Sequence, residues 1–222
     1  MAYLDKIKLA EYTRKEDWLN SISHMVGGGL SIVALILCLI KAYILKRWDY
    51  AFLSVIYSFT MIGMYTCSSV YHALRPNNGK KAMRMVDHSM IFPMIAGTFT
   101  PYAWLIIRPV NPTTSTALLF IAWITSAVAI ALTMTLFNQT KTLRMVLYLA
   151  MGWMVIVCIK TLWFNFNRIG FWLLVAGGIA YTIGAVIYGM GKKRPYFHSV
   201  FHFFVLAGSI LHFFSIFMYV FV

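Results

Sequence analysis

Four long stretches of the chain carry no charged side chain, and they recur at similar intervals along the sequence. In chain order they contain 25, 32, 23 and 28 residues. A helix needs about 20 predominantly apolar residues to cross the hydrocarbon core of a bilayer. Each stretch is therefore long enough to form a transmembrane helix; the four run from 50 to 74, 109 to 140, 169 to 191 and 195 to 222.

Three further apolar segments are shorter or contain a charge, and they run from Ile22 to Leu45, from His88 to Ile107 and from Met145 to Ile159. The pattern thus predicts an all-α membrane protein, a bundle of seven transmembrane helices. We expect residues 1–20 to form a cytoplasmic N-terminal segment and residues 21–222 a single transmembrane domain. Composition agrees, because 61% of the residues are hydrophobic and only 11% are charged, against about 25% charged in soluble domains.

The formal net charge of +13 raises the question of a nucleic-acid partner, but the positions of the 19 Lys and Arg residues indicate a membrane instead. With the N-terminus inside, cytoplasmic segments hold more than twice as many of them as the opposite side. The positive-inside rule then predicts a cytoplasmic N-terminus and an exterior C-terminus. We expect contact with anionic lipid headgroups and no nucleic acid. The cytoplasmic set is Lys6, Lys8, Arg14, Lys15, Arg75, Lys80, Lys81, Arg84, Lys141, Arg144, Lys192, Lys193 and Arg194; the exterior set is Lys41, Lys46, Arg47, Arg108, Lys160 and Arg168.

Several polar residues are predicted to lie at one depth near the cytoplasmic side. His72 ends the second span, which runs inward, and His198 and His202 begin the seventh, which runs outward. Asp87 begins the third span, and after Asp49 it is the only carboxylate in the chain. A carboxylate at membrane depth is costly and usually has a partner or a function. The alternative is that Asp87 caps the third helix and pairs with a nearby base, either Arg84 or Lys81.

The spacing of His198 and His202 favours a shared ligand. Residues four apart on a helix lie on one face with Cβ atoms roughly 6 Å apart, so the two imidazoles can bind one metal ion. A third ligand from His72 would complete the set typical of a catalytic zinc site and leave the fourth position to water. Ser68 precedes His72 by four residues, and we expect its hydroxyl and the Asp87 carboxylate to contact that water. The alternative is that the histidines only pack or contact headgroups.

Other candidate residues receive a structural interpretation. We expect His24, His88 and His212 to support the bundle or the site rather than to bind metal, with His88 pointing away from Asp87. Ser199 lies off the face shared by His198 and His202. The cysteines indicate no disulfide framework and no metal site, because Cys38, Cys67 and Cys158 lie far apart in apolar spans.

Five motifs together resemble the haemolysin III family, the bacterial branch of the progestin and adipoQ receptor (PAQR) group. They are EDWLNSISHMVG (16–27), SSVYH (68–72), MVDHSMIFPMIAGTFTP (85–101), GGIAYTIGAVIY (177–188) and HSVFHFFVLAGSILHF (198–213). The resemblance implies a seven-helix bundle in a bacterial plasma membrane. It further implies a zinc ion bound by His72, His198 and His202, with Asp87 and Ser68 contacting water. The positions of Glu16, Asn20 and His24 match the family's N-terminal signature, which we expect to close the cytoplasmic end through hydrogen bonds.

The wider group is similar to alkaline ceramidases in its arrangement of histidine, aspartate and serine. That similarity implies a zinc-dependent intramembrane hydrolase whose substrate is a lipid amide or ester, with an apolar cavity for the acyl chain. Two other functions are considered. One is membrane lysis by pore formation, for which the spans offer few aligned polar side chains. The other is a non-catalytic sensor of membrane lipids, in which zinc is structural.

Overall fold

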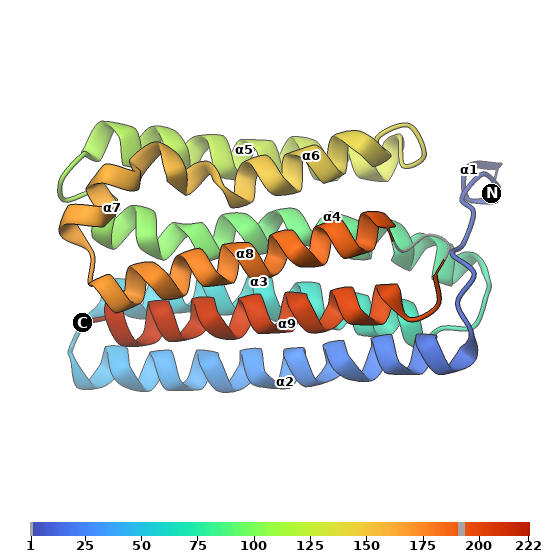
Figure 1. The fold of residues 1–222 in the computed structure, drawn as a ribbon, viewed down its shortest axis with the longest axis horizontal. Helices are drawn as coiled ribbons and strands as arrows, with labels where there is room; N and C mark the ends of the chain where they lie inside the picture. The colour runs from blue at the N-terminus through green and yellow to red at the C-terminus, as the bar shows by residue number, and fades with distance from the viewer. Residues whose placement is uncertain (1, 191–193) are drawn as a thin grey trace.

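The computed structural model describes residues 2–190 and 194–222, so Lys192 and Lys193 of the predicted cytoplasmic set lie outside the described residues. The described chain is helical and contains seven helices long and apolar enough to cross a membrane, which confirms the predicted fold class. Figure 1 shows them as roughly parallel rods, with the chain's two ends at opposite ends of the bundle. Which of these ends faces the cytoplasm stays a prediction.

Four helices bring the polar residues to one end of the bundle. They are α2 (Arg14–Ile44), α3 (Trp48–Ala73), α4 (Asn78–Tyr102) and α9 (Phe197–Ser215). Helix α2 packs on α3 and α9, and α3 packs on α4. The N-terminal ends of α2, α4 and α9 and the C-terminal end of α3 lie together on the side of the N-terminus (Figure 1). We call this the histidine end.

The remaining elements complete the bundle. Helix α8 packs against α9, and α5 against α4. In Figure 1, α5 and α6 lie along one edge of the bundle and α2 along the opposite edge. The elements are α1 (Ala2–Asp5), a π-helical turn at Ala103–Ile107, α5 (Pro112–Thr135), α6 (Lys141–Gly152), a 3₁₀ segment at Met154–Cys158, α7 (Ile159–Asn165), α8 (Arg168–Met190) and a π-helical turn at Ile216–Val220.

The first membrane-spanning helix, α2, begins at Arg14, upstream of the apolar span expected from Ile22. A capping box fixes this start: the Glu16 backbone N–H donates to the Thr13 hydroxyl at 3.2 Å, and the Thr13 N–H donates to the Glu16 carboxylate at 2.9 Å. Such reciprocal bonds satisfy backbone donors that a helix N-terminus otherwise leaves open. The first turns of α2 therefore carry polar side chains into the bundle.

Two other spans differ from the sequence expectation. The third begins at Asn78 rather than His88, and neither Pro93 nor Pro101 ends it; α4 continues to Tyr102 and then passes into the π-helical turn. The fifth span runs from Lys141 to Asn165, past the expected end at Ile159, and is broken by the 3₁₀ segment. Hydropathy alone does not reveal such a break, because the residues on both sides of it are apolar.

Candidate metal centre

Three histidine side chains converge at the histidine end. His72 comes from the last turn of α3, while His198 and His202 lie one turn apart on α9. The Nε2 atom of His198 lies 3.2 Å from Nε2 of His72 and 3.1 Å from Nε2 of His202. One ring nitrogen from each residue lies within 4.8 Å of the other two. The residues that the sequence selected as candidate ligands are thus brought together from two helices.

Hydrogen bonds to the other ring nitrogens orient two of these imidazoles. His72 Nδ1 donates to the Asp17 carboxylate at 3.0 Å, and His202 Nδ1 donates to the backbone carbonyl of Asn20 at 3.2 Å. Both acceptors lack a proton, so the neutral rings carry their proton on Nδ1 and leave Nε2 with an open lone pair. Such bonds to the distal ring nitrogen are what metal-binding histidines require.

The position of His198 makes this arrangement suitable for a cation. A neutral imidazole has one N–H group, so its Nε2 can donate to only one of the two lone pairs beside it. At least one of the two short Nε2–Nε2 contacts therefore opposes lone pairs. The Nδ1 atom of His198 is buried without a hydrogen-bond partner among the described residues. A cation bound by all three nitrogens would remove this repulsion between lone pairs. Three imidazoles are a set of ligands that suits Zn²⁺.

Asp17 was not selected from the sequence, although it supports the site directly. Besides accepting from His72, its carboxylate accepts from Lys80 Nζ at 2.6 Å, and all three side chains are largely buried. The sequence did contain a pattern that could have identified Asp17. Asp17, Asn20 and His24 recur at spacings of three and four, which places them on one face of a helix, but that face becomes relevant only once α2 is known to begin at Arg14.

Asp87 lies beside the histidines and does not cap its helix. Because α4 begins at Asn78 with Asn77 as the N-cap, Asp87 falls in the helix interior, and the capping alternative is wrong. The suggested basic partners are engaged elsewhere, since Lys81 pairs with Asp5 at 3.9 Å and Arg84 donates to the Lys8 carbonyl.

The immediate neighbours of the Asp87 carboxylate are Ser68 and His88. Ser68 is buried and lines the same cavity as Asp87. His88 was expected to point away, but its Nδ1 lies 3.5 Å from Asp87 Oδ2 because its ring turns back along α4. Ser68, Asp87, His198 and His202 thus line one cavity, and His88, which was assigned elsewhere, lines it too.

The N-terminal part of the chain covers the histidine end. Glu16 accepts from the Tyr196 backbone N–H at 2.7 Å, and the Asn20 side-chain oxygen accepts from the Ser199 hydroxyl at 2.6 Å. These bonds agree with the closing role expected of Glu16 and Asn20. The Tyr12 ring stacks on His198 with centroids 4.8 Å apart. Burial raises the pKa of the Tyr12 hydroxyl, so the covering ring is neutral at physiological pH.

His24 and His212 take structural positions. The His24 ring stacks on His202 at a centroid distance of 3.6 Å, and neither of its nitrogens has a hydrogen-bond partner among the described residues. His24 was expected to form a hydrogen bond at the histidine end, but it stacks on His202 instead. His212 Nε2 donates to the Leu174 carbonyl at 3.0 Å, deep in the bundle.

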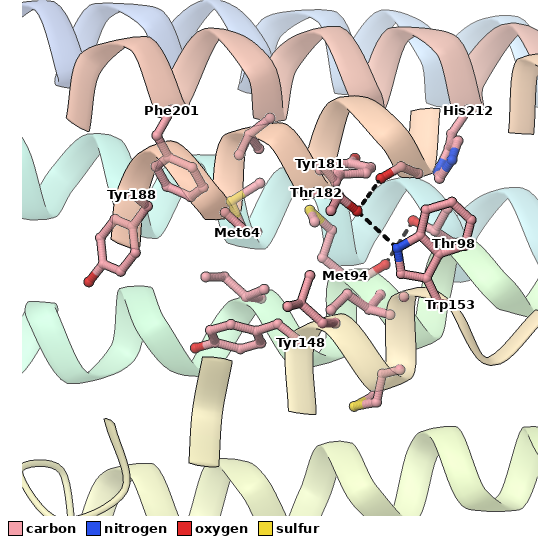
Figure 2. Close-up of a pocket in the computed structure, with 18 of the residues that line it drawn as sticks. Met64, Met94, Thr98, Tyr148, Trp153, Tyr181, Thr182, Tyr188, Phe201 and His212 are labelled. Atoms are coloured by element: carbon pink, nitrogen blue, oxygen red, sulfur yellow. Dashed lines mark hydrogen bonds between the residues drawn. The ribbon is translucent and has the colours of Figure 1, made fainter. Parts of the chain in front are cut away.

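A cavity of about 160 Å³ extends from this polar group into the bundle. Asp87, His198 and His202 line one end of it, and Trp153 and His212 line the other. Figure 2 shows Met64, Met94 and Tyr148 pointing into the space between these ends. The break in the fifth span places Trp153 against the cavity, where its indole N–H donates to Thr182 at 2.9 Å. The cavity is therefore polar at the histidines and mostly apolar beyond them.

The seven apolar helices define a multi-pass integral membrane protein, and the comparisons with known proteins identify the family. A family model described as Haemolysin-III related matches residues 12–213. The chain is 34% identical over 209 residues to the hemolysin-3 homolog of Bacillus subtilis (strain 168), covering 94% of this chain and 96% of the relative. It is 35% identical over 207 residues to hemolysin-3 of Bacillus cereus, covering 93% and 92%.

A more distant relative is the human monocyte to macrophage differentiation factor, which is 25% identical over 169 residues, or 74% of this chain and 68% of the relative. The chain belongs to the haemolysin III-related family, which confirms the resemblance read from the five motifs. It is a multi-pass protein of the bacterial plasma membrane.

Proposed function

We propose that the protein is a zinc-dependent intramembrane hydrolase whose substrate is a lipid amide or ester. The observation that carries the proposal is the convergence of three imidazole nitrogens at the polar end of a mostly apolar cavity. His72, His198 and His202 would hold the ion. A zinc ion so bound supplies Lewis acidity, which lowers the pKa of water to about 7 and polarises a carbonyl group.

Asp87 is the residue of this chain best placed to move protons. Its carboxylate lines the cavity beside His198, and the Ser68 hydroxyl can orient it. In hydrolysis, Asp87 accepts a proton from the attacking water as the oxygen forms a bond to the acyl carbon. It returns the proton to the amine or alcohol when the C–N or C–O bond breaks. The products are a fatty acid and that amine or alcohol.

The apolar part of the cavity would hold the acyl chain. Its walls between the histidines and Trp153 include Met64, Met94 and Phe99, whose side chains offer no charge to a hydrocarbon. Burial of a chain there gains about 0.8 kcal/mol per methylene relative to water. This contribution favours a long acyl group with its carbonyl at the histidine end.

The test measures zinc content and fatty-acid release on the same detergent-purified samples. We expect stoichiometric zinc in the wild type, and its loss in His72→Ala, His198→Ala and His202→Ala. Asp87→Asn should keep zinc and lose hydrolysis of labelled acyl amides and esters by about 10²-fold or more. His212→Ala controls for loss of a buried imidazole on the same helix, and Asp49→Asn for loss of a carboxylate.

Each outcome decides a part of the proposal. Metal-free wild-type protein would overturn the zinc site. Zinc-loaded protein that releases no fatty acid from any lipid amide or ester would overturn the hydrolase and favour the non-catalytic sensor. In that case, Asp87→Asn should also leave lipid binding unchanged.

The name of the Bacillus cereus relative supports a second candidate, a pore-forming cytolysin. Single-channel recordings on the reconstituted protein separate the two functions. Conductance that survives the double substitution His198→Ala and His202→Ala would favour a pore over chemistry at the histidines. The absence of conductance in active protein would favour the hydrolase.

A further inference from the structure

A second hollow, of about 290 Å³, lies at the histidine end, outside the three-histidine site. It is bounded by the N-terminal segment, by α4 and by the start of α6. The described residues that line it include no Asp or Glu. They include five bases: Lys6, Lys8, Arg84, Lys141 and Arg144. Positive charges that share one concave surface repel one another unless an anion lies between them.

Two of these bases cannot simply extend into solvent. The guanidinium groups of Arg84 and Arg144 lie over the Phe137 ring, 5.4 and 4.2 Å from its centre. Arg144 is 5% exposed, and its Nη1 donates to the Phe137 carbonyl and the Thr140 hydroxyl at 2.7 Å each. The contacts hold the group in place without neutralising its charge, because both acceptors are uncharged.

Arg84 leaves a donor unused beside the hollow. Its Nη1 donates to the Lys8 carbonyl, whereas its Nε is buried with no hydrogen-bond partner among the described residues. A buried donor without a partner costs about 1–3 kcal/mol. The cost disappears if an anionic oxygen accepts from it, and charge-assisted bonds of this kind are stronger than neutral ones.

The start of α6 adds a further positive contribution. Helix α6 begins at Lys141, which lines the hollow, and its N-cap residue Thr140 makes no capping hydrogen bond. The Thr140 hydroxyl instead donates to the Leu136 carbonyl at 2.9 Å. The first backbone N–H groups of this 12-residue helix are therefore uncapped, and the partial positive charge of a helix N-terminus favours an anion there.

We propose that this hollow binds a phosphate group, carried by an anionic lipid headgroup or present as a free phosphate ion. The Arg84 and Arg144 guanidiniums supply planar pairs of donors, which match phosphate oxygens, while Lys6 and Lys8 close the site from the N-terminal segment. The N-terminal segment continues to Tyr12, which stacks on His198. A bound phosphate would therefore also hold this segment in place over the histidine end. The site does not depend on metal or on hydrolysis.

The test measures equilibrium binding to the full-length protein in a non-ionic detergent. The probes are inorganic phosphate, dioctanoyl phosphatidic acid and dioctanoylglycerol, which lacks the phosphate. Lys6→Gln combined with Lys8→Gln removes two exposed charges that line the hollow without disturbing packing. The matched control is Lys15→Gln combined with Arg75→Gln, two exposed bases at the same end that do not line it.

We expect phosphate-dependent binding that weakens by about tenfold or more in the Lys6/Lys8 variant and is unchanged in the Lys15/Arg75 variant. Arg144→Gln should remove binding. If that buried change prevents folding, as judged by size-exclusion chromatography, the two lysine substitutions decide the question.

The two phosphate probes distinguish the source of the ligand. Much tighter binding of phosphatidic acid than of inorganic phosphate assigns the site to a lipid headgroup, and similar affinities show that free phosphate suffices. Three results would overturn the site: no binding of either phosphate probe, equal weakening in both double variants, or binding of dioctanoylglycerol as tight as that of phosphatidic acid.

Discussion

The Nδ1 atom of His72 donates a hydrogen bond to Asp17 across 3.0 Å, joining the end of α3 to the start of α2. Lys80, from the first turn of α4, donates to the other oxygen of the same carboxylate at 2.6 Å. Three helices are thus connected through one buried carboxylate. It orients a candidate metal ligand and neutralises a lysine that is only 2% exposed.

Asp17→Asn should therefore affect both stability and zinc binding. Loss of one member of a buried ion pair leaves the other charge uncompensated, which typically costs about 3–5 kcal/mol. Loss of the carboxylate behind a metal-binding histidine typically weakens metal binding by about 10–100-fold. Denaturant unfolding in detergent and competitive zinc chelation measure the two effects, and Asp49→Asn is the exposed control.

The double variant Asp17→Asn with Lys80→Met separates these effects. It removes the unpaired buried charge, so we expect it to recover much of the lost stability while zinc affinity stays low. Full zinc affinity in Asp17→Asn would show that this carboxylate does not support the site.

His24→Phe should keep stoichiometric zinc. The phenyl ring preserves the stacking on His202, and it replaces two ring nitrogens that have no hydrogen-bond partner among the described residues. Because buried polar atoms without partners are unfavourable, we expect a free energy of unfolding unchanged or raised by about 1 kcal/mol. Metal analysis and unfolding curves check both expectations. Loss of zinc would instead make His24 a ligand.

Gly177→Ala should destabilise the contact between α8 and α9. A Cβ atom at Gly177 would meet His212 Cδ2 at 2.2 Å and the Gly208 carbonyl at 3.2 Å, so the imidazole must leave its bond to Leu174. We expect a loss of about 1–3 kcal/mol in unfolding free energy.

The same substitution at Gly29 provides the control. A Cβ atom there meets nothing within 4 Å, and alanine forms helices better than glycine does. We therefore expect the free energy of unfolding to rise by about 0.5–1 kcal/mol. Equal effects at Gly177 and Gly29 would contradict the close packing of α8 on α9.

Lys46→Gly should stabilise the turn between α2 and α3. Lys46 has φ 53°, and the Arg47 and Lys46 N–H groups donate to the Ala42 and Tyr43 carbonyls in a Schellman arrangement. A non-glycine residue in this left-handed region costs about 1–2 kcal/mol. We expect the free energy of unfolding, measured by thermal or denaturant unfolding, to rise by about 1 kcal/mol. The control is Lys160→Gly within α7, which should lower it. A loss at Lys46 as well would refute the assigned backbone geometry.

Several features of the site were predictable from local patterns. Apolar run lengths predicted seven spans, and the direction of each span then placed His72, His198 and His202 at one end of the bundle. The four-residue spacing on α9 placed two imidazoles on one face. These inferences succeed because span length and helical periodicity depend on neighbouring residues along the chain.

The partners of each polar group were decided only by the tertiary structure. The alternative that paired Asp87 with Arg84 or Lys81 is wrong, because its carboxylate lies near Ser68 and His88 instead, and Asp17 was overlooked. Helix rotation and packing determine which side chains meet, and neither is encoded by hydropathy. The sequence by itself determined the number of spans and the depth of the histidines. The tertiary structure decided the tautomers of His72 and His202, the acid that supports His72 and the basic hollow beside them, because these depend on contacts between helices far apart in the chain.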